Sequence, residues 1–269
     1  MKELGELKNL RELPGAESSA VSSGSTGRLV PDSALLRNQG SAVLRLSSFV
    51  RAVAAVVWKD LVAEVRSKEL LSAMLVFSLI VTVIFSFALE LRLDRAGLVA
   101  PGMLWSTFAF AGTLGLNRSL AIEKDRGCLD GLLQCPVDRS ALYFGKAIGN
   151  LLFMLIVEAL VLPLFTVLFN VMLLNAGVAL VVLVGTIGFA GVGTLISTMA
   201  VNTRAREVMM PVLLFPATIP LILAAVKATR GVLDGLPAEN VTGWIGILVA
   251  YDLVLLAISY LTFDFVVEE

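Results

Sequence analysis

Six long apolar stretches, nearly free of charged residues, dominate the chain from residue 70 onwards. An α-helix rises ~1.5 Å per residue, so about 20 apolar residues are enough to cross the hydrocarbon core of a bilayer. Within these stretches only Glu158, in the third, and Asp252, in the sixth, carry a charge. A buried helix of a soluble core could explain one such stretch but not six in succession. The pattern predicts an all-α integral membrane protein with six transmembrane helices, at about residues 70–89, 97–117, 147–169, 177–201, 208–226 and 243–263.

Residues 48–69, just before the first span, show an amphipathic pattern instead. Apolar residues such as Val50, Val57 and Leu61 recur at helical spacing, with charged residues between them. This pattern predicts an interfacial helix lying along the cytoplasmic surface of the membrane. A helix packed on a soluble partner is the alternative. The charged residues that mark this helix as a candidate contact site are Lys59, Asp60, Glu64 and Arg66.

The first 46 residues have neither pattern. Acidic and basic residues alternate at the start, residues 18–27 are mostly Ser and Gly, and no apolar core of a signal peptide follows. We therefore expect a disordered, low-complexity N-terminal extension over residues 1–46, with a docking peptide for a partner as the alternative. Residues 47–269 then form the six-span domain.

The basic residues near the span ends are unevenly distributed between the two sides. If the N-terminus is cytoplasmic, the inside segments hold eleven Lys and Arg residues and the outside segments hold four. Because Lys and Arg accumulate in cytoplasmic loops, this asymmetry predicts that both termini are cytoplasmic. Arg204, Arg206 and Glu207 fall in a very short inside loop. They are explained either by this charge bias or by contact with a partner subunit.

Composition narrows the function classes. The chain is 57% hydrophobic and 16% charged, with a net charge of −1 and a mean hydropathy of +0.88, so nothing indicates nucleic-acid binding. It contains no His and two Cys, which excludes His-based catalysis and the usual zinc sites, and we predict no metal site. The phosphate-binding pattern GxxxxGK[ST] is absent as well. We expect a protein that is not an enzyme, and any ATP must be hydrolysed by a separate subunit.

The longest hydrophilic segment between spans, residues 118–146, is cytoplasmic by the charge argument. An apolar turn interrupts its charged residues, so it can form a short helix across the membrane face with leucines available to a partner. A solvated loop explains the pattern equally well. The candidate coupling residues in this segment are Glu123, Arg126, Leu132, Leu133, Pro136 and Lys146.

Four short segments occur in a fixed order along the spans and their cytoplasmic loops. They are Trp58–Leu61, Pro101–Trp105, Glu123–Gly127 with Leu132, Leu133 and Pro136, and Thr203–Glu207. Together they resemble the permeases of ABC-2-type exporters, and more narrowly the CcmB family, the haem-exporter permease B of cytochrome c maturation. The similarity extends over roughly residues 50–265 and leaves the N-terminal extension outside.

This resemblance implies a permease in the bacterial inner membrane that works with a separate ABC ATPase, the A protein of the system, which uses the ATP. The further partners implied are the haem-handling C protein, the small D protein and the periplasmic haem chaperone E, besides membrane lipid. No cofactor is expected on this chain, and haem is its possible cargo. Energy from ATP would drive either haem export or release of the haem-loaded chaperone.

Two other hypotheses stay open. An ABC-2 permease could move another cargo, such as a lipid, glycan or drug, and a membrane scaffold could assemble partners without transporting anything. Glu158 and Asp252 are functional candidates because charge inside a span is costly. Glu158 can instead be protonated, or bonded to Ser, Thr or Asn on a neighbouring helix, and Asp252 can snorkel or pair near the outer side. Three prolines are expected to bend or break the fifth span, at Pro211, Pro216 and Pro220.

Overall fold

The computed structural model describes residues 33–89, 96–125, 139–201, 203 and 205–266. The chain divides into two compact units, residues 1–43 and 44–269. Of the first unit the structure describes residues 33–43, which are helical. The second unit contains all six predicted spans.

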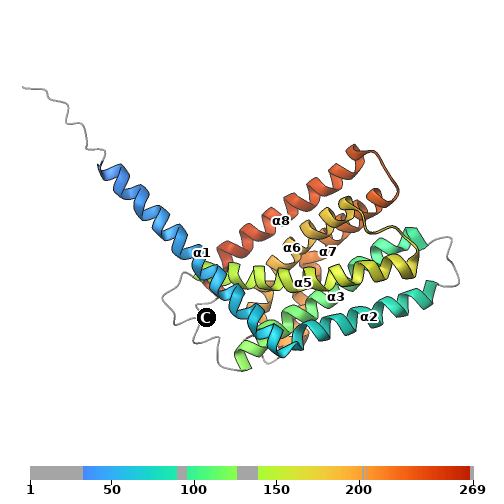
Figure 1. The fold of residues 1–269 in the computed structure, drawn as a ribbon, viewed down its shortest axis with the longest axis horizontal. Coiled ribbons are helices and arrows are strands. Elements are labelled where there is room, and N and C mark those ends of the chain that lie inside the picture. The colour runs from blue at the N-terminus through green and yellow to red at the C-terminus, as the bar shows by residue number, and fades with distance from the viewer. Residues whose placement is uncertain (1–32, 90–95, 126–138, 202, 204, 267–269) are drawn as a thin grey trace, which may run out of the picture. The chain divides into compact units, whose positions relative to one another are not determined.

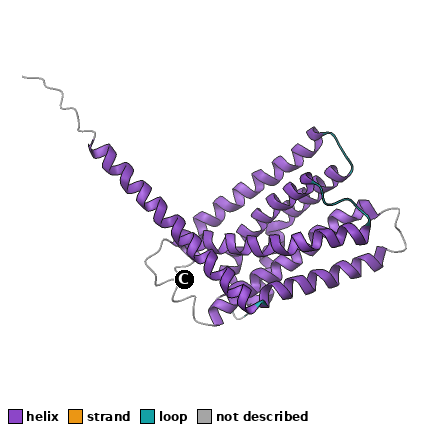
Figure 2. Cartoon of the chain, in the orientation of Figure 1, coloured by secondary structure: helices purple, strands orange, loops and turns teal. Residues whose placement is uncertain are grey.

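Helix accounts for nearly all of the described residues, and no strand occurs among them, as Figure 2 shows. The elements are α1 (Ser33–Ser67), α2 (Glu69–Leu89), α3 (Ala96–Asp125), α5 (Arg139–Phe169), α6 (Ala176–Val201), α7 (Arg206–Leu233) and α8 (Ala238–Val266). The helices α2, α3, α5, α6, α7 and α8 lie side by side (Figure 1).

Six of these helices are long and apolar enough to cross a membrane. They coincide with the six predicted stretches, so the predicted all-α, six-span fold is confirmed. Most of the helices run past the predicted bounds: α3 continues to Asp125 and α5 begins at Arg139. Hydropathy marks only the part of a helix that lies in hydrocarbon, whereas backbone hydrogen bonding carries the helix on through polar residues.

The segment before the first span differs from the prediction at both of its ends. The predicted helix at residues 48–69 is part of α1, which begins at Ser33 and ends at Ser67. Residues 33–46, predicted to be disordered, are therefore helical. The Ser- and Gly-rich pattern that suggested disorder ends at residue 27, outside the described residues. That α1 lies along a membrane surface stays a prediction.

The three prolines do not break the fifth span, so that part of the prediction is wrong, and a bend at these prolines stays a prediction. A single α-helix, α7, runs through Pro211, Pro216 and Pro220. Each proline removes one backbone donor, but the hydrogen bonds between the prolines and the packing of α7 against α3, α6 and α8 hold the helix together. Pro101 in α3 and Pro163 in α5 are accommodated in the same way.

The centre of the bundle is α6, which packs against α3, α5, α7 and α8. Its residues 188–197 are all buried. Glycines allow this crowding: a Cβ atom on Gly185 would lie 2.4 Å from the Trp105 ring, and one on Gly193 would lie 2.3 Å from Leu116. In lipid, where apolar surface alone does not drive association, such close approach supplies the packing energy.

Helix α1 meets the bundle where it crosses the first turns of α5. A Cβ atom on Gly145 would lie 2.7 Å from Cβ of Val56, and one on Gly149 would lie 3.4 Å from Oδ2 of Asp60. The two glycines are four residues apart and therefore share one face of α5. This small-residue face lets α1 approach the backbone of α5 closely.

Substitution at Gly145 tests this crossing. Gly145→Ala should lower the free energy of unfolding by about 1–3 kcal/mol, because Val56 is stiff at Cβ and cannot move aside. Gly246→Ala in α8, where a Cβ meets nothing within 4 Å, is the matched control and should leave stability unchanged or slightly raised. Thermal unfolding of both variants in detergent measures the difference. Equal melting temperatures would show that α1 does not depend on this contact.

Candidate functional site

Four charged side chains from three helices meet where α1 crosses the bundle. Lys59 and Asp60 come from α1, Glu123 from the last turns of α3, and Lys146 from the second turn of α5. Sequence analysis selected all four, but as two separate groups. The structure brings them into one cluster, called here the charge ring.

The charge ring is closed, with acidic and basic groups alternating around it. Lys146 Nζ lies 2.7 Å from Glu123 Oε1 and 2.8 Å from Asp60 Oδ2. Lys59 Nζ lies 3.2 Å from Asp60 Oδ1 and donates a hydrogen bond to Glu123 Oε1. Each lysine thus bridges the same two carboxylates, so no pair can separate without disturbing the others.

Burial makes these ion pairs stronger than ordinary surface pairs. The side chains of Asp60, Glu123 and Lys146 are each 10% exposed, and that of Lys59 is 41% exposed. Burial opposes the charge of Lys59, but the hydrogen bond and charge of Glu123 and the charge of Asp60 outweigh it and raise the pKa of Lys59 above its usual 10.5. A raised pKa means that its stabilising contribution is complete below about pH 10.5 and is lost only at more alkaline pH.

Next to the ring, Glu64 fixes the turn between α1 and α2. Its Oε1 accepts a hydrogen bond of 2.8 Å from the backbone N–H of Leu71, and its Oε2 accepts one from Ser67 Oγ at 3.4 Å. The first satisfies a donor that every helix start leaves free. Lys68, the single residue between the two helices, has a φ of 54°. Glu64 is therefore a structural cap at this junction.

A cavity of about 260 Å³ adjoins the charge ring. All four ring residues line it, together with Leu70 of α2, Phe153 of α5 and further residues of α1 and α3. It is partly open to the outside. The ring is thus one wall of a largely apolar cavity at the junction of α1, α2, α3 and α5.

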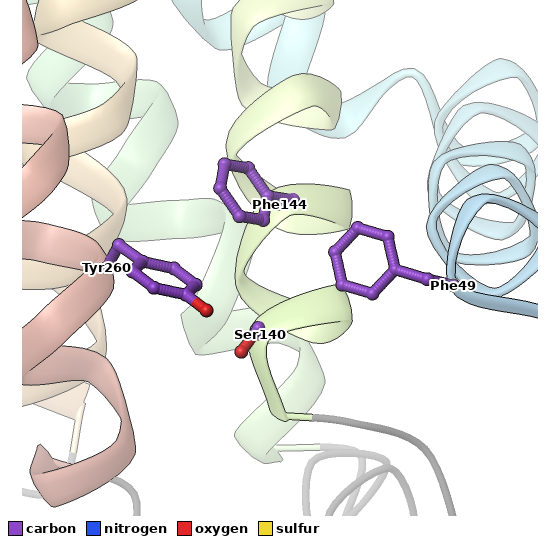
Figure 3. Close-up of a pocket in the computed structure, with 4 residues that line it drawn as sticks. All are labelled: Phe49, Ser140, Phe144 and Tyr260. Carbon is purple, nitrogen blue, oxygen red and sulfur yellow. The ribbon is translucent and has the colours of Figure 1, made fainter. Parts of the chain in front are cut away.

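A second, more open pocket of about 570 Å³ lies between α1, α5 and α8. Figure 3 shows its aromatic lining, with Phe144 between Phe49 and Tyr260 and the Tyr260 hydroxyl directed toward Ser140. The ring centroid of Phe144 lies 6.2 Å from that of Phe49 and 5.9 Å from that of Tyr260. Aromatic rings with a polar tip are typical of the boundary between hydrocarbon and water.

Glu158 lies inside the bundle and has a partner on the neighbouring helix. It is 3% exposed, and Thr186 Oγ1 of α6 lies 2.9 Å from both of its carboxyl oxygens. The same hydroxyl lies 2.8 Å from the carbonyl oxygen of Val182. The sequence alternative of a hydroxyl partner is therefore observed, and Glu158 acts as a polar link between α5 and α6.

Asp252 has no such partner. It is 5% exposed, and neither carboxyl oxygen makes a hydrogen bond to any residue that the structure describes. The carboxyl group fills the notch left by Gly188 of α6, where a Cβ atom would lie 1.8 Å from Oδ1, with Leu221 of α7 beside it. The expectation that Asp252 pairs near the outer surface is wrong, because the side chain points into the α6–α7–α8 contact.

The other predicted site residues do not join the charge ring. Arg66 and Glu207 are exposed. Arg206 is the first residue of α7, but its side chain is not described. The predicted coupling residues Arg126, Leu132, Leu133 and Pro136, together with Arg204, lie outside the described residues. Their roles stay predictions.

These features define a polytopic membrane protein whose first helix is locked by buried charges to one end of a six-helix bundle. The chain matches the family model described as CcmB protein over residues 51–268. It therefore belongs to the CcmB family.

Two curated relatives carry the name heme exporter protein B. The protein of Rhodobacter capsulatus is 27% identical over 188 residues, which cover 69% of this chain and 85% of the relative. The protein of Bradyrhizobium diazoefficiens is 27% identical over 160 residues, covering 59% of this chain and 72% of the relative.

The charge ring yields one prediction. Lys146→Met leaves two buried carboxylates to share the more exposed Lys59, so we expect a loss of about 3 kcal/mol in the free energy of unfolding. Arg118→Met is the control, because Arg118 pairs with Glu69 where both side chains are more than 40% exposed, and exposed pairs contribute about 1 kcal/mol or less. Denaturant unfolding in mixed micelles compares the two. Equal losses would contradict a special role for the ring.

The two intramembrane carboxyl groups yield another. Asp252→Leu keeps the side-chain branching and removes two unpaired oxygens, so the free energy of unfolding should rise by about 1–3 kcal/mol. Glu158→Leu should lower the free energy of unfolding because the hydrogen bond that links α5 to α6 is lost, whereas Glu158→Gln keeps that bond and should be tolerated. Melting temperatures of the three variants test this. A lower melting temperature for Asp252→Leu would mean that a further group satisfies Asp252 in the membrane.

Proposed function

We propose that this chain is the membrane permease subunit of a haem-export system serving cytochrome c maturation, driven by a separate ABC ATPase. Its membership of the CcmB family and the name of its relatives support this function. The six membrane-crossing helices supply the transmembrane part of such a system. In this function the chain is a transporter subunit, and the ATPase partner carries out the chemistry.

The observation that carries the proposal is the position of the charge ring. It joins α1 to the end of α3 and the beginning of α5, the two helices on either side of residues 126–138. A force that the ATPase applies to this connecting segment therefore reaches α3, α5 and α1 together. From α3 and α5 it passes to α6, which both helices contact.

The proposed setting is a bacterial inner membrane with both chain termini in the cytoplasm. Six crossings return the chain to the side on which it starts, and the excess of Lys and Arg near the span ends supports a cytoplasmic position for that side. In α1, Trp58 is 70% exposed and Val65 is 69% exposed, which suits contact with lipid at the membrane surface. We further propose the A, C, D and E proteins of cytochrome c maturation as partners and haem, free or on its chaperone, as cargo.

Affinity purification and complementation test this function together. The tagged full-length chain, extracted from its native membrane, should bring with it an ABC ATPase and the haem-handling C and D proteins. In a strain lacking its own copy, Glu123→Ala should lower holocytochrome c at least about tenfold, because one buried carboxylate of the ring is lost. Glu239→Ala, an exposed acidic residue at the start of α8, should support the wild-type level.

Three outcomes would contradict the proposal. An ATPase accompanied by lipid or glycan enzymes would indicate an exporter of another cargo. An intact complex without any ATPase, or one whose output is unchanged when the ATPase is catalytically dead, would indicate a scaffold. Normal holocytochrome c with Glu123→Ala, in a protein that inserts normally, would remove the charge ring from the coupling route.

A further inference from the structure

The cavity beside the charge ring combines apolar walls with the charged groups of the ring and Glu64. Ala63, Leu70, Ile122 and Phe153 supply apolar surface from α1, α2, α3 and α5. Glu123 and the Ser119 hydroxyl lie on the same lining. A long side chain with an aliphatic stem and a charged end has the same division of apolar and polar parts.

The charges around this cavity do not balance. Among the described residues, three carboxylates and two ammonium groups line it, which leaves an excess of one negative charge in this part of the lining. Both oxygens of Asp60 contact the lysines, and both oxygens of Glu64 accept hydrogen bonds. Glu123 is 8% exposed, and its second oxygen, Oε2, is buried without a hydrogen-bond partner among the residues that the structure describes. Such an oxygen costs free energy until a donor reaches it.

We propose that this cavity receives one basic side chain, an arginine by preference, from the ATPase subunit that docks on this end of the bundle. The inference rests on the proposed function, because that function supplies the partner. The guanidinium group donates to Glu123 Oε2 and neutralises the excess charge. Its stem packs on the apolar lining that Leu70, Ile122 and Phe153 supply.

Other occupants fit the lining less well. Water supplies a donor to Glu123 Oε2 but leaves the excess negative charge in place. Calcium and magnesium ions take about six or more oxygen ligands, whereas Glu123 Oε2 is the one carboxylate oxygen of the described lining that lacks a partner. The apolar walls would also remain without a function. A basic side chain neutralises the excess negative charge, donates a hydrogen bond to Glu123 Oε2 and packs its aliphatic stem against the apolar walls.

Glu123→Gln tests the charge directly. The amide carbonyl can keep the contacts to both lysines, while the amide nitrogen takes the place of Oε2 and presents a donor to the incoming cation. We expect the dissociation constant of the purified ATPase for the full-length chain in lipid nanodiscs to rise at least about tenfold. Glu69→Gln makes the same change of charge at the same end of the bundle but outside the cavity. This control should leave the dissociation constant of the ATPase within about threefold of the wild-type value.

Ala63→Phe provides a second test that leaves every charge in place. The larger ring fills the cavity and should weaken ATPase binding as Glu123→Gln does, with the melting temperature of the free chain as a check on folding. If the wild type binds the ATPase and both variants bind it equally well, the cavity holds water only and the inference is wrong while the proposed function stands. If the wild-type chain binds no ATPase at all, the proposed function fails and takes this inference with it.

Discussion

Hydrocarbon around the six spans offers no hydrogen-bond partner, and this constraint governs where every polar group in the bundle lies. Most span hydroxyls donate to the carbonyl oxygen four residues earlier in their own helix, as do those of Ser78, Thr82, Thr113 and Thr218. A few groups link helices instead: Trp105 donates to Thr229, and Asn150 to Thr194. Against this background the unpaired carboxyl group of Asp252 is the exception.

The sequence predicts the membrane fold well because the lack of hydrogen-bond partners in hydrocarbon determines both the residue types of a span and its helical structure. Lipid-facing and buried positions of a span are alike apolar, so hydropathy locates all six helices. It cannot place their ends, since helical hydrogen bonds continue into water at the ends of α3 and α5. The sequence also overestimates the helix-breaking effect of the three prolines in α7. Packing of α7 on three neighbouring helices maintains a continuous helix that intrinsic helix propensity alone would interrupt.

The charge ring could not be predicted for a different reason. Its residues were each recognisable as candidates, but Lys146 pairs with Asp60 86 positions away, and Lys59 with Glu123 64 positions away. Such pairs depend on where α1 crosses α5, which is set by the two glycines that admit Val56 and Asp60. A spacing of small residues four apart, Gly145 and Gly149, was the available signal of this crossing. It carries no information about which helix approaches.

The one-residue junction between α1 and α2 has a mechanical consequence. The backbone hydrogen bonds from Lys68 N–H to Glu64 O, at 2.7 Å, and from Ser72 N–H to Lys68 O, at 3.2 Å, carry the backbone bonding through the turn. With Glu64 also bound to the first turn of α2, little slack remains between the two helices. A rotation of α1 is consequently passed on to α2, the first membrane span, because no flexible linker lies between them. The two helices therefore move together, with the bend between them fixed at Lys68.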